Sequence, residues 1–269
     1  MKMEMMGLKM KEGMLLSFVV LGSISFLFLV IPVVNVFLNA PLDEILKAIL
    51  DESVQNSIML SFYTAALTTA FAFVFGTPLA YILARKNFPL KGLVDSFIDI
   101  PILLPHTVAG IALLTVFGGS GFLGEIFSYL GVKFVDTILG ILVAQVFVSI
   151  PFYIKTVRES FEKIDYRYYK VARTLGATPF RAFFEVEFPL SFHSMVSGAI
   201  LCWARALSEF GAVIVLSYHP PIAPVLIYQR FVLQGLKATL PITSLLIILT
   251  VVIFLIMRKI QYGMEGKLS

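Results

Sequence analysis

Long apolar runs, separated by short polar segments, occupy most of the 269-residue chain. A helix needs roughly 20 mostly apolar residues to cross a bilayer, and six runs approach or exceed that length. They are about Met14–Leu38, Val54–Ala84, Phe97–Phe117, Ile138–Ile154, Pro189–Leu216 and Leu240–Met257. Because a helix satisfies its own backbone hydrogen bonds in lipid, and because the alternation of a closed barrel is not seen, the pattern predicts six transmembrane helices.

Two of the runs are irregular. The second, Val54–Ala84, is longer than a bilayer requires and should tilt or protrude. The third contains Asp99, Pro101, Pro105 and His106, so we expect its early part to be kinked or to lie at the interface. Since no internal repeat or low-complexity linker divides the chain, we expect residues 1–269 to form one transmembrane domain.

Composition agrees with the membrane assignment. The chain is 58% hydrophobic and only 14% charged, whereas soluble domains carry about 25% charged residues. The net charge of +4 does not indicate a nucleic-acid partner, because the basic residues lie in short segments between apolar runs. The single cysteine, Cys202, lies within an apolar run and leaves no disulfide framework or cysteine metal cluster.

The distribution of Lys and Arg predicts the orientation. With the N-terminus inside the cell, 16 of the 21 basic residues fall in inner segments and only four in outer loops. Positively charged residues concentrate on the cytoplasmic side of membrane proteins. We therefore expect a multi-pass protein with both termini in the cytoplasm.

A basic and aromatic insert, about residues 163–188, separates the fourth and fifth runs, on the side predicted to be cytoplasmic. Asp165 is placed to cap a short helix from about Tyr166 to Leu175, and Gly176 to end it. Two such helices at an angle would make a compact knob for another protein to grip. The alternative is an amphipathic loop that lies on the lipid headgroups.

The second helix of the insert is predicted from Thr178 and Pro179, which suit an N-cap and a first helical position. It should end near Glu187, with Pro189 opening the next span.

The insert resembles the cytoplasmic motif of permease subunits of ABC importers, which reads Glu-Ala-Ala, three residues, Gly, nine residues, Ile-x-Leu-Pro. Ala172, Gly176 and Pro189 match it, Val186 and Phe188 are conservative, and Lys170 and Val171 depart from it. In that family the segment is the coupling helix, which docks in a groove of the ATP-binding subunit. The resemblance assigns ATPase coupling to Lys170, Val171, Ala172, Gly176, Ala177, Pro179, Val186, Phe188 and Pro189.

The fifth run narrows the class. Its residues 203–213 look like the Arg-Ala-Leu-Gly-Glu-Phe-Gly-Ala stretch of sulfate and molybdate permeases, with Ser208 in place of the usual Gly, a variation associated with the archaeal molybdate/tungstate branch. Residues 95–118, 221–224 and 228–231 are similar to matching parts of that group. Together the resemblance covers residues 54–258.

The resemblance implies an all-α integral membrane protein with the type I permease fold of ABC importers, which moves molybdate or tungstate across the cell membrane. Its partners would be a second copy of the chain, two ATP-binding subunits, an extracytoplasmic oxyanion-binding protein and the lipid bilayer. ATP and Mg would be bound by the ATPase. The chain has no GxxxxGK[ST] phosphate-binding loop, so we expect it to be no enzyme and to hold no cofactor or metal of its own.

Arg205 and Glu209 lie i,i+4 in the fifth run and share a helix face. Arg205 follows Pro189 by sixteen residues, roughly 24 Å along a straight helix, which places it in the outer half of the membrane. Ionisable groups at such depth rarely face lipid. One interpretation is a translocation pathway or gate formed by Arg205, Ser208, Glu209 and Gly211; the other is a structural pair that joins the fifth span to a neighbour.

Other polar residues also admit two interpretations. His106 either senses pH or binds anion, or is a satisfied interfacial histidine. Arg230, in the last outer loop, either contacts the binding protein or is a solvated loop charge. Hydroxyls in the second run would serve an oxyanion or neighbouring helices; they belong to Ser61, Thr64, Thr68 and Thr69.

Three other functions compete with this one. A sulfate/thiosulfate permease shares the stretch in the fifth run but usually pairs with a second, different permease. A membrane-embedded enzyme would need clustered catalytic polar residues, which the sequence does not show. An ion-driven secondary transporter typically has inverted repeats with paired broken helices, and it would leave the insert unexplained.

Overall fold

In a computed structural model, residues 2–265 are described. They form helices joined by short segments, without a strand among them. Met1 and residues 266–269 lie outside the described part. The prediction that the C-terminus is cytoplasmic concerns residues outside that part. The helices before the insert are α1 (Lys2–Leu38), α2 (Leu42–Leu50), α3 (Glu52–Phe71), α4 (Thr77–Arg85), α5 (Lys91–Leu103), α6 (His106–Phe117), α7 (Phe122–Ser128) and α8 (Ile138–Lys163). After it begins come α9 (Arg167–Thr174), α10 (Pro179–Ala182), α11 (Phe188–Leu207), α12 (Gly211–Leu216), α13 (Ala223–Gln234) and α14 (Leu236–Glu265).

Within residues 2–265, four helical segments are long and apolar enough to cross a membrane: Met14–Leu38, Glu52–Arg85, Ile138–Lys163 and Leu236–Gln261. They coincide with the first, second, fourth and sixth predicted spans. The third prediction corresponds to α5 and α6, which form one further span if the bent pair is counted together. The prediction that this run is broken is confirmed, because α5 and α6 meet at 116° across Leu104 and Pro105.

The fifth run is interrupted, contrary to the single predicted span Pro189–Leu216. Helix α11 ends at Leu207, and α12 begins only at Gly211. Ser208 closes α11 with its N–H on the carbonyl oxygens of Ala204 and Ala206. His193, Arg205 and several serines lower the mean hydropathy of α11, which is why this helix is absent from the four apolar segments.

The end of the insert also differs from the prediction. No helix ends near Glu187, because α10 continues through the π-helical turn η2 (Phe183–Glu187) into α11. Pro189 therefore lies inside a continuous helical segment. A second π-helical turn, η1 (Ala72–Gly76), joins α3 to α4, and Pro78 follows it at the same offset. A widened turn before proline accommodates the missing N–H and the ring, so the helix continues.

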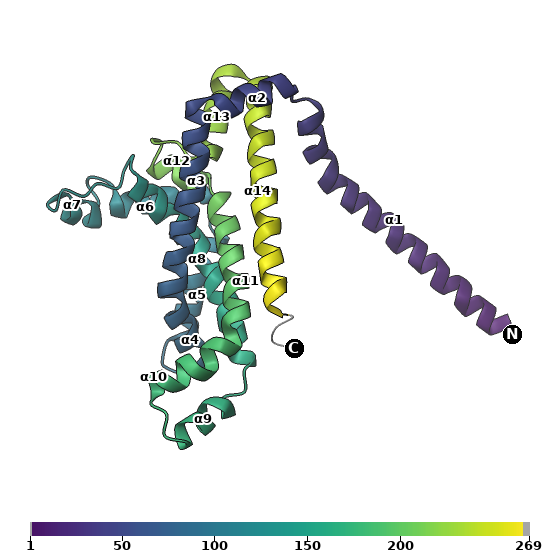
Figure 1. The fold of residues 1–269 in the computed structure, drawn as a ribbon, viewed down its shortest axis with the longest axis vertical. Coiled ribbons are helices and arrows are strands. Elements are labelled where there is room, and N and C mark those ends of the chain that lie inside the picture. Colours follow the sequence, from purple (N-terminus) through teal and green to yellow (C-terminus); the bar gives the residue numbers. More distant parts are fainter. Residues whose placement is uncertain (1, 266–269) are drawn as a thin grey trace.

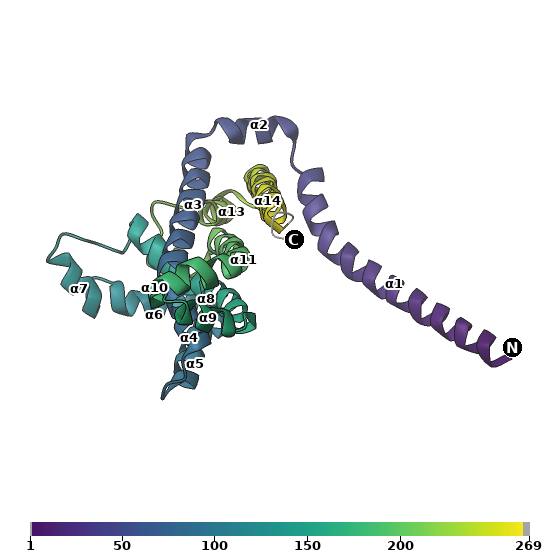
Figure 2. The same cartoon turned by 60° about the horizontal axis from the view of Figure 1, so that its bottom comes forward.

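Helix α8 is the centre of the bundle, where it packs against α3, α4, α6, α11 and α12. The long helices run roughly along the long axis of the molecule, with α9 and α10 at one end and α2 and α13 toward the other (Figure 1). Helix α1 diverges from this body in both views (Figures 1 and 2), and none of its residues from Met14 to Leu38 is buried. The bundle thus presents the insert as a protrusion at one end.

Candidate functional site

The insert has the local structure that its sequence predicts. The Asp165 carboxylate accepts the backbone N–H of Arg167 at 2.9 Å, and α9 follows. Gly176, with φ of +91°, takes the left-handed conformation that favours glycine after a helix. Thr178 caps α10 by accepting the N–H of Arg181 at 3.2 Å. The caps confirm the predicted start and turn of the knob.

The coupling residues predicted from the motif lie along this protrusion. Lys170, Val171, Gly176, Pro179 and Pro189 are exposed. The smaller or inner-facing members are half-buried: Ala172, Ala177, Val186 and Phe188. Their role in docking stays a prediction, since the structure contains this chain alone.

Sequence reasoning missed a buried ion pair at the base of the insert. Arg85, the last residue of α4, donates from Nε to Glu187 at 2.8 Å, and Tyr81 donates its hydroxyl to the second carboxylate oxygen at 2.6 Å. The Arg85 side chain is 8% exposed and that of Glu187 is fully buried. Arg85 also donates to the carbonyl oxygen of Ile164 at 3.1 Å and lies 5.1 Å from the ring centre of Tyr166. The only signal in the sequence was a carboxylate inside an otherwise apolar motif.

A second polar cluster joins two helix breaks, the one between α5 and α6 and the one between α11 and α12. Arg205 donates to Glu209 at 2.6 Å, and its Nη2 lies within 3.0 Å of both ring nitrogens of His106, the first residue of α6. Glu209 also accepts the N–H of Ala212 at 2.8 Å. Ser208, in the break, lies 3.2 Å from Arg205. The predicted pair exists, and His106 is a satisfied histidine, as one of its two interpretations had it.

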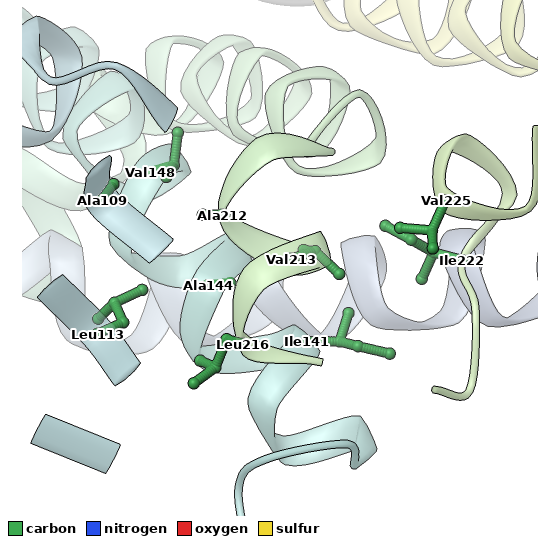
Figure 3. Packing of buried hydrophobic residues seen from close by; sticks show 10 residues of the cluster. All are labelled: Ala109, Leu113, Ile141, Ala144, Val148, Ala212, Val213, Leu216, Ile222 and Val225. Atoms are coloured by element: carbon green, nitrogen blue, oxygen red, sulfur yellow. The ribbon is translucent and has the colours of Figure 1, made fainter. Parts of the chain in front are cut away.

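Close packing holds α12 against α6 beside this cluster. A Cβ on Gly211 would approach the Cβ of His106 to 2.6 Å, and one on Gly110 would approach the backbone of Ala212 to 2.9 Å. Around this contact lies the apolar core shown in Figure 3, which draws residues from α6, α8, α12 and α13. Glycine is therefore required at position 211 for steric reasons.

The hydroxyls of the second span are used within the protein. Ser61 accepts the N–H of Ala223 at 2.7 Å, and Thr68 lies 3.2 Å from the Gln145 side chain, which in turn donates to a carbonyl of α11. Thr64 and Thr69 donate to carbonyl oxygens of their own helix. Contacts to neighbouring elements are thus present for Ser61 and Thr68, whereas the bonds of Thr64 and Thr69 described here stay within α3, and the role of any of the four toward an oxyanion stays a prediction.

Arg230 is paired with the start of α3. Its guanidinium donates to Asp51 at 2.6 Å and to Ser53 at 2.7 Å. The hydrogen bond from the Ser53 side chain, followed by that from Arg230, lowers the pKa of Asp51 to about 2. Arg230 is thus not a solitary loop charge, and its contact with a binding protein stays a prediction.

Metal-ligating residues are not gathered anywhere in residues 2–265 into a group of three or more that fits an ion. The two clusters described above consist of paired charges and neutral donors. Their geometry suits the fixing of helix ends, and it offers no arrangement of a nucleophile beside a general base.

Comparisons with known proteins place the chain in a family. Residues 76–266 match the family described as "Binding-protein-dependent transport system inner membrane component". The molybdate/tungstate transport system permease protein of Thermococcus kodakarensis is 39% identical over 243 residues, covering 90% of this chain and 93% of the relative. The probable sulfate transport system permease protein of Chlorokybus atmophyticus is 35% identical over 218 residues, covering 77% and 76%.

A solved structure shares the fold. A bacterial alginate ABC transporter, crystallised with a periplasmic protein carrying an alginate pentasaccharide, has a chain that superposes with a TM-score of 0.75 at 17% sequence identity. The superposition covers 96% of each chain. The family match spans most of the chain, and the fold agrees with it. This chain belongs to the inner membrane components of binding-protein-dependent transport systems.

Proposed function

We propose that the chain is the permease subunit of an ABC importer that carries molybdate or tungstate into the cytoplasm. The support is its family, the 39% identity to a molybdate/tungstate permease over nearly the whole chain, and the lower identity to a sulfate permease. In this proposal residues 1–269 are one permease domain with six spans, in which the bent pair α5–α6 and the broken α11–α12 each complete a crossing.

The observation that carries the proposal is the shape of the insert. It protrudes from the end of the bundle and exposes Val171, Leu175 and Phe180 beside the basic Arg167 and Arg181. Exposed apolar side chains on a protrusion mark a site of interaction with a protein or a membrane. An ATP-binding subunit is the partner that this family offers.

Orientation follows from the same protrusion. The start of α1 and the later part of α14 point toward the end of the long axis that holds α9 (Figure 1). With the basic insert in the cytoplasm, as the positive-inside rule favours, we propose that the described start of α1 and the described end of α14 lie on that side too.

The mechanism needs a mechanical path from the knob to the pore. The continuous helical segment from Pro179 through η2 to Leu207 provides one, because a displacement of α10 moves α11 with it. ATP-driven closure of two ATPase subunits, one on each copy of a homodimer, would then bias the bundle between inward-facing and outward-facing packings. The binding protein delivers the anion outside. ATP and Mg stay on the partner, so this chain contributes no catalytic residue.

We propose that the cluster around Arg205 is part of the gate. Ser208 lies in the break between α11 and α12, and Gly211 packs closely against His106. Arg205 is unsuited to hold a dianion at rest, because the Glu209 carboxylate neutralises its charge and its Nη2 already contacts both Glu209 and His106. Exchanging the two charges, Arg205→Glu with Glu209→Arg, tests this role. Loss of uptake in an assembled complex is expected, and transport at the wild-type rate rules out the gate.

The test of the proposed function uses two glycines with similar backbone geometry. Gly176 and Gly131 both have positive φ, +91° and +75°, and open space around the position of a Cβ. Leucine at either position therefore costs a similar backbone strain, on the order of 1–2 kcal/mol. Only Gly176 lies on the insert.

The chain is purified with a candidate ATP-binding subunit and a candidate binding protein from the same organism, and ATP-dependent uptake of labelled tungstate is measured in proteoliposomes. Gly176→Leu should lose ATPase association and uptake, whereas Gly131→Leu should keep both. Unchanged ATP-dependent uptake in Gly176→Leu contradicts the proposal. Uptake without ATP would indicate a secondary transporter, and a second permease type in the complex, with sulfate as the preferred anion, would indicate the sulfate class.

A further inference from the structure

We propose that Arg85 and Glu187, with Tyr81, form a clasp that closes the base of the insert and carries its displacement into the second span. The inference rests on the proposed function, in which the insert receives motion from an ATPase. Arg85, Glu187 and Tyr81 would be positioning residues for coupling and would contact neither nucleotide nor anion.

Arg85 contacts both ends of the insert at once. Its Nη1 donates to the carbonyl oxygen of Ile164, at the start of the insert, while its Nε donates to Glu187, near the end of the insert. Two points separated by more than twenty residues of chain are thereby held on one side chain. The knob moves as a closed unit and not as a loose loop.

The ion pair between Arg85 and Glu187 is buried. The Glu187 side chain is fully buried, and Tyr81 and Arg85 supply donors to both of its carboxylate oxygens. A buried charge that is fully hydrogen-bonded fixes geometry strictly, because any displacement leaves an unpaired charge out of water. The contact therefore holds the insert to α4 in one position.

The clasp lies between the second span and the predicted docking residues of the insert. Arg85 ends the long helical segment Glu52–Arg85, so force on its guanidinium acts on the second span. On the other side, the Tyr166 ring lies 5.1 Å from Arg85 and 5.6 Å from the Lys170 ammonium, and Lys170 is one of the predicted docking residues. The contacts run from the docking surface through Tyr166 to Arg85 and α4.

In this proposal a displacement of the insert reaches the membrane helices by two routes. One is the continuous helical segment that ends in α11, and the other is the clasp to α4. A permease that keeps the continuous helical segment but loses the clasp should still bind and stimulate the ATPase. It should move less anion for each ATP hydrolysed.

The experiment compares Arg85→Lys with Arg158→Lys in the full complex in proteoliposomes. Lysine at 85 keeps a positive charge beside Glu187 but cannot also hold the Ile164 carbonyl and stack on Tyr166. Arg158 is a matched control, since it is a partly buried arginine whose ion pairs, with Asp95 of α5 and Glu162 of α8, lie outside residues 165–187. Assembly, ATP hydrolysis and tungstate uptake are measured on the same preparations.

For Arg85→Lys we expect normal assembly and a fall of about tenfold in anion taken up per ATP hydrolysed, with Arg158→Lys near the wild type. Amide exchange over residues 165–186 should also be faster in Arg85→Lys. A wild-type uptake ratio in Arg85→Lys overturns the clasp, and so does an equal fall in both variants.

If Arg85→Lys does not assemble, Tyr81→Phe decides, because it keeps the ion pair and removes one bond to Glu187. A reduced amount of anion taken up per ATP hydrolysed in Tyr81→Phe then supports the clasp, and a wild-type amount overturns it. Failure of the proposed function would look different, since the wild-type chain itself would then bind no ATPase or move no oxyanion.

Discussion

The carboxylate of Glu209 accepts the backbone N–H of Ala212 at 2.8 Å. This bond satisfies one of the free N–H groups at the start of α12, while Arg205 neutralises the same carboxylate from the end of α11. One fully buried side chain thus joins the two halves of a broken helix.

Breaking the pair from the arginine side should be the more harmful change. Arg205→Ala leaves the buried Glu209 without its cation and should lower the free energy of unfolding by about 3 kcal/mol. Glu209→Gln removes the charge but keeps an acceptor for Ala212, so its loss should be smaller. Thermal unfolding of the purified chain in detergent measures both, and equal losses would contradict the assignment of a buried charge pair.

The contact between α6 and α12 makes a steric prediction. Gly211→Ala places a Cβ about where His106 already lies, at 2.6 Å from its Cβ, and overpacking of this kind typically costs about 1–3 kcal/mol. Gly92→Ala, where a Cβ meets nothing within 4 Å, is the control and should leave stability unchanged or slightly raised. A Gly211→Ala protein as stable as the wild type would show that the helices separate easily.

The tie between Asp51 and Arg230 predicts a pH dependence. Because the pKa of Asp51 is lowered in the folded protein, from 3.8 to about 2, its contribution to stability is complete above its ordinary value and is lost as the pH falls through about 2. The pair is partly exposed, so solvent screening limits the contribution to about 1 kcal/mol or less.

Asp51→Asn should accordingly be less stable than the wild type at pH 6, and the difference should shrink between pH 4 and pH 2. Asparagine still caps α3, which isolates the loss of the ion pair. Unfolding curves at the two ends of this range test the sign, and a difference that grows on acidification would be the wrong result.

Cys202 should be chemically inert in the folded protein. It is fully buried in the core formed by η1, α4, α8 and α11. A maleimide should therefore leave the native chain unlabelled and react only after denaturation. Mass spectrometry before and after denaturant measures this, and labelling of the native chain would place α11 on an open surface.

Local sequence patterns predicted much of this structure. Apolar runs of sufficient length identified four spans, and the broken third run was evident from Pro101 and Pro105. Asp165, Gly176 and Thr178 each act on neighbours within three residues, so the caps of the insert were also readable.

The remainder depends on contacts between distant parts of the chain. Arg85 and Glu187 are 102 residues apart, and Arg205 and His106 are 99 apart, so no local pattern links them. Proline gave the wrong boundary at 189, because the π-helical turn before it lets the helix continue. The break after Leu207 was missed because the run stays mostly apolar, and only the bonds made by Glu209 reveal the joint.

The central claim is that the insert faces the cytoplasm and is covered by an ATP-binding subunit. The buried Cys202 permits a direct test, since single cysteines can be added to the native chain. Leu175→Cys is 82% exposed directly after α9, and Leu50→Cys is 80% exposed as the last residue of α2; these two helices lie toward opposite ends of the molecule (Figure 1). A membrane-impermeant maleimide should label Leu175→Cys only in inside-out vesicles, and less when the ATPase subunit is bound, whereas Leu50→Cys should react only in right-side-out vesicles. Labelling of Leu175→Cys from outside, or labelling that the ATPase leaves unchanged, would contradict the account.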